Sequence, residues 1–450
     1  MKDLTTGHPG KVLFSYILPL FGSIIFQQLY NVADSFVAGR YIGTAALAAV
    51  GNSYEITLIY IAMAMGCNIG ASVITADFYG QKRYGNVRTC VHTALIFSAV
   101  MGLVLTLVGV CISPWLLGLI NTPEEVFADS ELYLNIYLLG YVFLLIYNVA
   151  TGIFSALGDS QTPFWFLAVS SVSNIFVDIL FVKEFHMGVA GVAWATFLCQ
   201  SLSGIAALVA ILKKVHTLKH EGDSHLFSFP ILWKILHVAI PSAFQQGFIS
   251  IGNIIIQSVI NSFGTAAMGG YAAAIKLNNM TITSITAISN GLSNYSAQNI
   301  GAGKKERVHS GSMWGWLLSG GFAVLFTAVY LIFSNQLIGL FITDGDAEAT
   351  QIGVNFLRIV TPFYLVVATK LTFDGILRGA QQMAVFMIST STDLILRVAL
   401  TWVFSGIWQV TGIWMSWPVG WTVGTLISVL LYRRWHKKYI LAKSPSPIVE

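Results

Sequence analysis

The chain has 450 residues, of which 55% are hydrophobic and only 10% are charged, and its formal net charge is +4. Soluble domains carry about 25% charged residues, so a chain this poor in charge cannot cover a water-facing surface. The composition therefore excludes a soluble protein. The small positive charge follows membrane sidedness and indicates no nucleic-acid partner.

Apolar stretches recur along the chain, each long enough to cross a bilayer core of about 30 Å with about 20 residues. They predict an all-α integral membrane protein. A membrane β-barrel is excluded because stretches such as 95–110 lack the period-2 alternation of barrel strands. The twelve predicted transmembrane helices are 13–39, 46–77, 88–112, 131–157, 162–183, 188–212, 235–261, 266–297, 309–333, 351–378, 383–405 and 411–432.

A unit of about 220 residues occurs twice, at an offset of 221 residues. Gly43-Thr44-Ala45-Ala46, for example, returns as Gly264-Thr265-Ala266-Ala267. Six helices per copy put both copies in the same orientation, so we predict a parallel internal repeat and two pseudo-symmetric six-helix bundles. The predicted parts are an N-lobe (1–212), a linker (213–234), a C-lobe (235–434) and a tail (435–450).

Basic residues assign the two sides of the membrane. Of the 24 Lys and Arg residues, 18 fall on the side that holds both termini and the linker. The positive-inside rule makes that side cytoplasmic. We therefore expect a multi-pass protein of the plasma membrane, with both termini in the cytoplasm and the lipid bilayer as its surroundings. We further expect a monomer.

The first span carries a polar face that ends in a carboxylate. An ionisable residue inside a membrane is costly enough to be a functional candidate, and Asp34 is one. Helical spacing places four polar side chains on one face, which we expect to look into a polar interior: Gln27, Tyr30, Asn31 and Asp34. We assign Asp34 to cation coupling, and Gln28, Tyr30 and Asn31 to a substrate cleft. The alternative is a plain ion pair of Asp34 with Arg40 at the outer interface.

Asn174 and Asp178 are spaced i, i+4 in the fifth span and therefore project to one face. A buried, protonated Asp178 could carry a proton, whereas the ionised carboxylate with Asn174 could coordinate Na⁺. Thr196 in the sixth span is a further candidate oxygen, unless its hydroxyl bonds back to its own helix. At offset 221, Asn174 corresponds to Ile395 and Asp178 to Ala399, so the C-lobe lacks this set.

Aromatic residues run i, i+4, i+8 along the fourth span, at Tyr133, Tyr137 and Tyr141. Packing in the core or against lipid is one interpretation. The other is an aromatic wall that binds a flat organic cation through cation–π contact. Tyr133, Tyr137 and Asn148 are our further candidates for the substrate cleft.

Other charged residues lie in the second, eighth, tenth and eleventh spans. Glu55 and Lys276 occupy the same repeat position with opposite charge, so we predict a gate or latch between the lobes. Two i, i+4 pairs in the C-lobe are expected to be intrahelical ion pairs that hide charge in the membrane: Lys370 with Asp374, and Asp393 with Arg397.

Three motifs occur in order along this doubled chain: Gln28-Leu29-Tyr30-Asn31-Val32-Ala33-Asp34, Ala156-Leu157-Gly158-Asp159-Ser160-Gln161-Thr162-Pro163 and Ala297-Gln298-Asn299-Ile300-Gly301-Ala302-Gly303. With them, the chain resembles the multidrug and toxic compound extrusion (MATE) family over about residues 8–440. The resemblance implies antiport of H⁺ or Na⁺ against lipophilic, often cationic, organic compounds. It also implies that Asp34, Asn174 and Asp178 match the family's cation site, with no other metal or cofactor.

We therefore predict a secondary active multidrug efflux antiporter that works by alternating access. The leading alternative is a flippase for a lipid-linked saccharide or another lipid, which would need Arg or Lys residues for the phosphates. A membrane enzyme would need a catalytic set at a membrane face, and His92 and His237 stand alone near helix ends. We expect no enzymatic activity.

Overall fold

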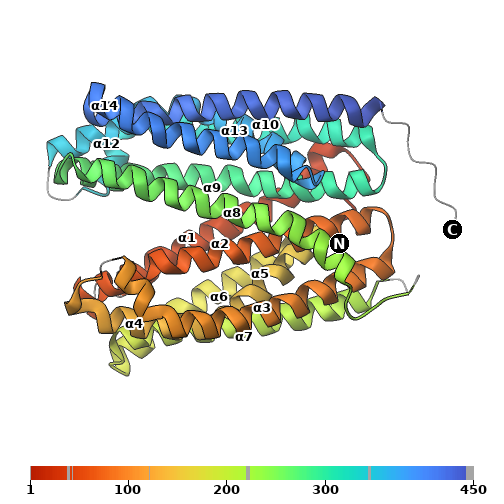
Figure 1. Cartoon of the computed structure of the whole chain (residues 1–450), viewed down its shortest axis with the longest axis horizontal. Helices are drawn as coiled ribbons and strands as arrows, with labels where there is room; N and C mark the ends of the chain where they lie inside the picture. Colours follow the sequence, from red (N-terminus) through yellow and green to blue (C-terminus); the bar gives the residue numbers. More distant parts are fainter. Residues whose placement is uncertain are drawn as a thin grey trace. The chain divides into compact units, whose positions relative to one another are not determined.

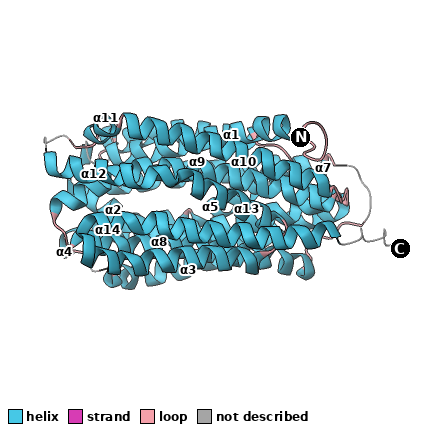
Figure 2. Ribbon diagram, turned by 90° about the horizontal axis from the view of Figure 1, so that it is seen from above, coloured by secondary structure: helices cyan, strands magenta, loops and turns pink. Residues whose placement is uncertain are grey.

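The structure is a computed structural model, and it describes residues 2–37, 41–42, 44–120, 122–218, 223–342 and 346–441. These residues are almost entirely helical, and no strand occurs among them (Figure 1, Figure 2). The prediction of an all-α protein is confirmed.

Two compact units make up the chain. Unit 1 comprises Met1–Asp3 and Ser15–Phe244, and unit 2 comprises Leu4–Phe14 and Gln245–Glu450. In chain order the first helices are α1 (Pro9–Val37), α2 (Thr44–Gly80), α3 (Tyr84–Leu119), α4 (Glu124–Leu139), α5 (Tyr141–Ala156), α6 (Gln161–Ile179), a π-helical turn (Leu180–Glu184) and α7 (Gly188–His216). The later helices are α8 (Phe229–Asn261), α9 (Thr265–Gly301), α10 (Lys305–Ile332), α11 (Ser334–Gly339), α12 (Ala347–Val360), a 3₁₀ turn (Thr361–Phe363), α13 (Tyr364–Gly379) and α14 (Met383–Leu441).

Where the structure describes them, the twelve predicted spans coincide with helices, but the fourth and the tenth are each interrupted and the last two lie in one element. Within the described residues, nine helices are long and apolar enough to cross a membrane, and a bent pair would make ten. The bent pair is α4 and α5, which meet at Gly140 with a bend of 47°. The fourth predicted span is therefore two helices, because the chain turns at a glycine, a poor helix former.

The last two predicted spans lie in the single element α14, whose backbone leaves the helical conformation at Trp408 and Gln409. Its two halves run antiparallel in unit 2, since Ser389 contacts Ser428 and Thr401 contacts Ser416. Figure 1 shows the halves as two adjacent blue ribbons. A hairpin this tight explains why one element holds two spans.

Helix α9 falls outside the nine because its buried face is polar. Many of its buried side chains are hydroxyls or amides: Asn278, Thr281, Ser284, Ser289, Ser293, Asn294, Ser296, Gln298 and Asn299. A polar face inside a helical bundle is tolerated when neighbouring helices satisfy it. Tyr330 and Leu371 do so for two of these residues, by contacts with Thr281 and Ser289.

Each unit packs a central helix against a long neighbour at a glycine. In unit 1, a Cβ on Gly152 of α5 would lie 2.7 Å from the backbone oxygen of Asn68 in α2. In unit 2, a Cβ on Gly375 of α13 would lie 2.5 Å from the backbone oxygen of Ser289 in α9. Only glycine allows the backbones to approach this closely. Each unit therefore contains its own helix crossing of the same kind, at corresponding glycines.

The first residues of the chain are bound by unit 2. Arg307 donates hydrogen bonds to the carbonyl oxygens of Leu4, Thr6 and Gly7, at 3.1, 3.1 and 2.6 Å. Lys304 Nζ donates to the carbonyl oxygen of Thr5 at 2.7 Å. The side chain of Leu4 is fully buried. Cations and apolar burial thus fix residues 4–7 at the junction of α9 and α10.

Candidate cation site in unit 1 and buried charges in unit 2

Helix α6 of unit 1 has one buried polar face and one exposed apolar face. Asn174 and Asp178 are 1% and 0% exposed, and Ser171 is buried beside them. Val172 and Phe176, on the opposite face, are 45% and 69% exposed. The prediction that Asn174 and Asp178 project to one face is confirmed, and this face is buried.

Thr196 lies on α7, which packs against α6, and is 1% exposed. Unit 1 therefore buries a carboxylate, a carboxamide and a hydroxyl on two adjacent helices. Oxygen ligands of this kind suit a hard cation, and a buried carboxyl can instead take up a proton. The positions of Asp178 and Thr196 agree with either use.

The predicted site residues of the first span belong to α1, which is helical to Val37. This helix meets α6 where Phe26 packs edge-on against Phe164, with ring centroids 5.6 Å apart. Four side chains further along α1 lie outside the described residues: Gln28, Tyr30, Asn31 and Asp34. Their assignment to the cation site and the substrate cleft stays a prediction.

The aromatic candidates lie in the core of unit 1. Tyr133 and Tyr137 are each 7% exposed and stack with their ring centroids 6.4 Å apart. Tyr141 follows the Gly140 bend and donates its hydroxyl to the carbonyl oxygen of Tyr60 at 3.0 Å. Asn148 is half-buried and donates to Leu144 of its own helix at 2.9 Å. The structure thus gives both tyrosine candidates a packing role.

The gate candidates are only partly described. Lys276 on α9 is exposed, and its Nζ lies 5.3 Å from the ring centroid of Phe341 in the same unit. The side chain of Glu55 on α2 lies outside the described residues. Their pairing stays a prediction.

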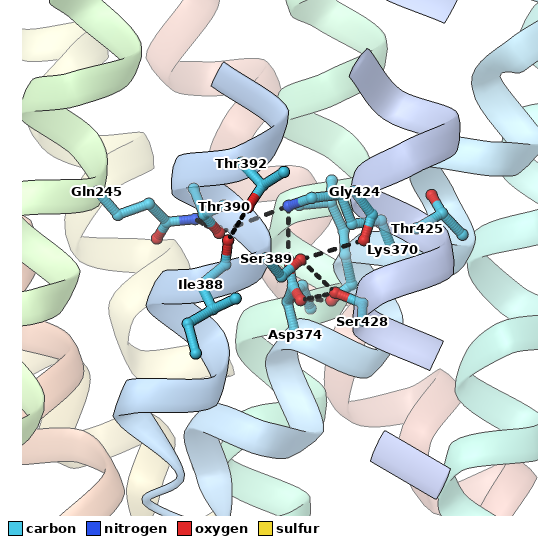
Figure 3. A network of polar contacts seen from close by, with 12 residues as sticks. Gln245, Lys370, Asp374, Ile388, Ser389, Thr390, Thr392, Gly424, Thr425 and Ser428 are labelled. Atoms are coloured by element: carbon cyan, nitrogen blue, oxygen red, sulfur yellow. Dashed lines mark hydrogen bonds and ion pairs between the residues drawn. The ribbon is translucent and has the colours of Figure 1, made fainter. Parts of the chain in front are cut away.

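Unit 2 contains a buried ion pair within α13. Lys370 Nζ lies 2.7 Å from Asp374 Oδ2, and the two side chains are 3% and 2% exposed. Ser428 of α14 donates to the other carboxylate oxygen, Asp374 Oδ1, and Ser389 contacts both Ser428 and the carbonyl oxygen of Gly424 (Figure 3). The predicted pair of Lys370 with Asp374 is confirmed.

The second predicted pair is wrong. Asp393 and Arg397 are 8% and 5% exposed, but no ion pair joins these two described residues. The guanidinium of Arg397 instead lies over the ring of Trp417, 4.6 Å from its centroid. Asp393 Oδ1 and Arg397 Nε have no hydrogen-bond partner among the described residues. The i, i+4 spacing brings the residues close, but stacking on the indole turns the arginine away.

The repeat register also needs correction, and helix bounds locate the shift. α2 and α9 both begin at Thr and end at Gly, 221 residues apart. α5 and α13, however, begin at Tyr141 and Tyr364, two residues further apart. His186 and Gln409, each with φ of 52°, keep this larger spacing. The second copy therefore contains two extra residues between α10 and α13.

Because of this insertion, Asn174 and Asp178 correspond to Arg397 and Thr401, not to Ile395 and Ala399. The C-terminal half still lacks the acid of the N-terminal set. A guanidinium occupies the position of the carboxamide.

Two hydroxyls near the buried ion pair were not predicted: that of Ser428, which donates to Asp374, and that of Ser389, which contacts Ser428. Thr390 and Gln245, which contact each other at 3.5 Å near Lys370, were not predicted either (Figure 3). The signal was present in the spacing of Gly420 and Gly424, since small residues at i, i+4 mark close helix contacts in membranes. A Cβ on Gly424 would lie 3.0 Å from Lys370 Cε.

Comparison with known proteins gives a consistent result. The family model MatE matches twice, at residues 19–180 and 241–403, once in each copy of the repeat. The probable multidrug resistance protein YpnP of Bacillus subtilis is 28% identical over 96% of this chain and 97% of its own length. An FAD transporter of Shewanella oneidensis is 25% identical over 76% of this chain and 77% of its own length. A solved outward-facing multidrug resistance MATE family transporter of the MOP superfamily superimposes with a TM-score of 0.91, at 22% identity over 98% of this chain and 99% of that one.

Proposed function

Because this chain belongs to the MatE family of membrane transporters, we propose that it is a secondary active multidrug exporter. It exchanges H⁺ or Na⁺ for lipophilic, often cationic, organic compounds by alternating access. The relative from Bacillus subtilis, named as a probable multidrug resistance protein, supports the drug part of this proposal.

One observation carries the coupling part of the proposal. Asp178 is fully buried on the inward face of a membrane helix, one turn after the equally buried Asn174. An ionisable residue in a membrane interior is expensive to keep and marks an ion or substrate path. Asp178 binds the coupling cation in this proposal, with Asn174 and Thr196 as oxygen donors and Asp34 as the second carboxylate.

Coupling requires that ion and drug favour different conformations, since only a difference in affinity shifts a conformational equilibrium. The cation binds at unit 1 and favours the state that releases drug. The second copy of the repeat lacks an equivalent cation site, because Arg397 and Thr401 stand at the positions of Asn174 and Asp178. Ion coupling therefore belongs to unit 1.

The test is transport in liposomes. Purified protein is reconstituted, and movement of a fluorescent organic cation is measured under an imposed pH gradient and then under a Na⁺ gradient. Asp178→Asn keeps the shape of the side chain but removes its charge, so gradient-driven transport should fall at least tenfold. Asp129→Asn, a change at an exposed acid of α4, serves as the control and should transport normally.

Asp34→Asn should behave as Asp178→Asn does. Gradient-driven transport that persists in Asp178→Asn, at normal reconstitution and with the control intact, would refute coupling at unit 1. Transport driven by neither gradient in the unchanged protein would refute cation antiport itself.

A second candidate function is transport of an anionic compound, such as a lipid-linked phosphate or a dinucleotide. Within the described parts of α13 and α14, the buried charged side chains are three cations and two acids: Lys370, Arg378, Arg397, Asp374 and Asp393. The relative from Shewanella oneidensis is named an FAD transporter. Uptake of FAD or of a labelled lipid-linked saccharide by the same liposomes, without transport of the organic cation, would favour this candidate.

We also propose a plasma-membrane protein that works as a monomer with both termini in the cytoplasm. The 18 basic residues on one side support that orientation. Cysteine labelling from each side of intact cells, at a residue added to either terminus, tests the orientation.

A further inference from the structure

The surroundings of Lys370 in unit 2 are those of a cation site. Its Nζ lies 2.7 Å from Asp374 Oδ2 and 3.5 Å from the hydroxyl oxygen of Thr390 (Figure 3). The hydroxyl of Ser428 donates to the other carboxylate oxygen of Asp374, and the hydroxyl of Ser389 contacts that of Ser428. Carboxylate and hydroxyl oxygens are the donors that alkali and other hard cations prefer. Here the cation they surround is attached to the chain.

The aliphatic part of the Lys370 side chain packs closely against the backbone of α14 at Gly424. A Cβ on Gly424 of α14 would lie 3.0 Å from Lys370 Cε and 3.4 Å from Lys370 Cδ. The same Cβ would lie 2.9 Å from the Cβ of Asp393. The absence of a side chain at Gly424 therefore opens the path by which the amine reaches Asp374.

Unit 2 has a second fixed positive charge, at the position that corresponds to the candidate cation site of unit 1. Arg397 occupies the repeat position of Asn174, is 5% exposed and lies over Trp417. A mobile cation binding beside it would meet a like charge in a medium of low dielectric constant, which is unfavourable. Both places in unit 2 are thus occupied by cationic side chains.

We propose that Lys370 is a tethered cation that fills an oxygen-lined cation site in unit 2, so that this site takes no exchangeable ion. The consequence is a division of labour. Unit 1 binds the mobile ion, and unit 2 keeps a permanent one, which leaves its charge constant through the transport cycle. Removing the amine should turn the site into one that binds small monovalent cations. The inference concerns Lys370 and does not depend on which ion unit 1 uses.

The test is cation rescue of Lys370→Ala. All variants are made in an Asp178→Asn background, so that binding at unit 1 is removed or at least equal in every sample. Thermal melting is followed in detergent in the chloride salts of Na⁺, K⁺, methylammonium and ethylammonium at one ionic strength. N-methyl-D-glucamine, which is too large for the vacated space, is the reference.

With Lys370 present, the melting temperature should be the same in every salt. Lys370→Ala should melt several degrees lower in N-methyl-D-glucamine and regain stability as a small cation is added, because a ligand that binds only the folded state stabilises it. Ethylammonium should rescue and uncharged ethanol should not. The double variant Lys370→Ala, Asp374→Asn should show no rescue, since it lacks the carboxylate.

Lys370→Ala without any small-cation response, or with a response equal to that of the double variant, overturns the proposal. Where Lys370→Ala fails to fold, equilibrium binding of radioactive Na⁺ decides the question with Lys370 in place. The Asp178→Asn protein should bind no Na⁺ at unit 2. Binding that Asp374→Asn abolishes would show an exchangeable ion there and overturn the proposal. Since all comparisons share one background, failure here leaves coupling at unit 1 untouched.

Discussion

Replacing Gly375 by alanine tests the close crossing of α13 and α9 in unit 2, which has a counterpart in unit 1. The added Cβ would lie 2.5 Å from the backbone oxygen of Ser289, about 0.9 Å short of an ordinary 3.4 Å contact. This oxygen belongs to the backbone and cannot rotate away as a side chain could, so α13 and α9 must separate. Overpacking of this kind costs about 1–3 kcal/mol, and the better helix propensity of alanine returns about 1 kcal/mol. The net loss is therefore about 0–2 kcal/mol, and relative to a glycine-to-alanine change without overpacking it is about 1–3 kcal/mol.

Gly152→Ala is the matched change in unit 1, where the Cβ would lie 2.7 Å from the oxygen of Asn68. It should destabilise by a similar or slightly smaller amount. Gly321→Ala on α10 is the control, because a Cβ there meets nothing within 4 Å. This change should be neutral or raise the stability.

Melting of the three purified variants, followed by tryptophan fluorescence and by size-exclusion chromatography after heating, measures the effect. Both crossing variants should melt several degrees below the control. If Gly375→Ala melts like Gly321→Ala, the close approach of α13 to α9 is wrong. Gly152 and Gly375 have the same larger spacing that aligns Arg397 with Asn174, so the corrected repeat register would then lose one of its supports.

Three further predictions follow from unit 2. Arg307→Ala should lower the free energy of unfolding by about 1–3 kcal/mol, since three backbone carbonyls lose a charged donor. Glu306→Ala, a change at an exposed neighbour, should melt like the unchanged protein, and equal melting temperatures of the two variants would contradict the docking of residues 4–7. Gly424→Ala should destabilise by about 1–3 kcal/mol through overpacking against the Lys370 stem, and unchanged melting would argue against that path. Arg397→Met should cost at most about 2 kcal/mol, the loss of one cation–π contact, and a loss above about 3 kcal/mol would reveal a carboxylate partner.

The membrane spans could be predicted from the sequence because membrane helices are long apolar runs. The sequence could not predict the turn at Gly140, since apolar residues continue through it. The break between the predicted spans 383–405 and 411–432 does coincide with the hairpin at Trp408 and Gln409. Helix α9 contains the predicted span 266–297 in spite of its polar buried face.

The candidate site was predictable where spacing alone decides the geometry. Asn174 and Asp178 must share a helix face at i, i+4, and they do. The same spacing failed for Asp393 and Arg397, because the nearby Trp417 competes for the guanidinium, and sequence spacing contains no such neighbour.

A single offset misaligned the later half of the repeat. The two extra residues lie between α10 and α13, and apolar sequence on both sides conceals such a slip. Turn residues with positive φ, such as His186 and Gln409, locate it in the structure.

The contacts of residues 4–7 with Arg307 bear on how the protein is made. Leu4 and Arg307 are 303 residues apart, so one end of this contact leaves the ribosome long before the other. At about 5–20 residues per second, the interval is about 15–60 s. During that time the first residues have no docking place, and Leu4 must be kept from other apolar partners. Unit 2 is therefore completed by residues that are made long before its other helices, and a fragment that starts after the linker lacks them.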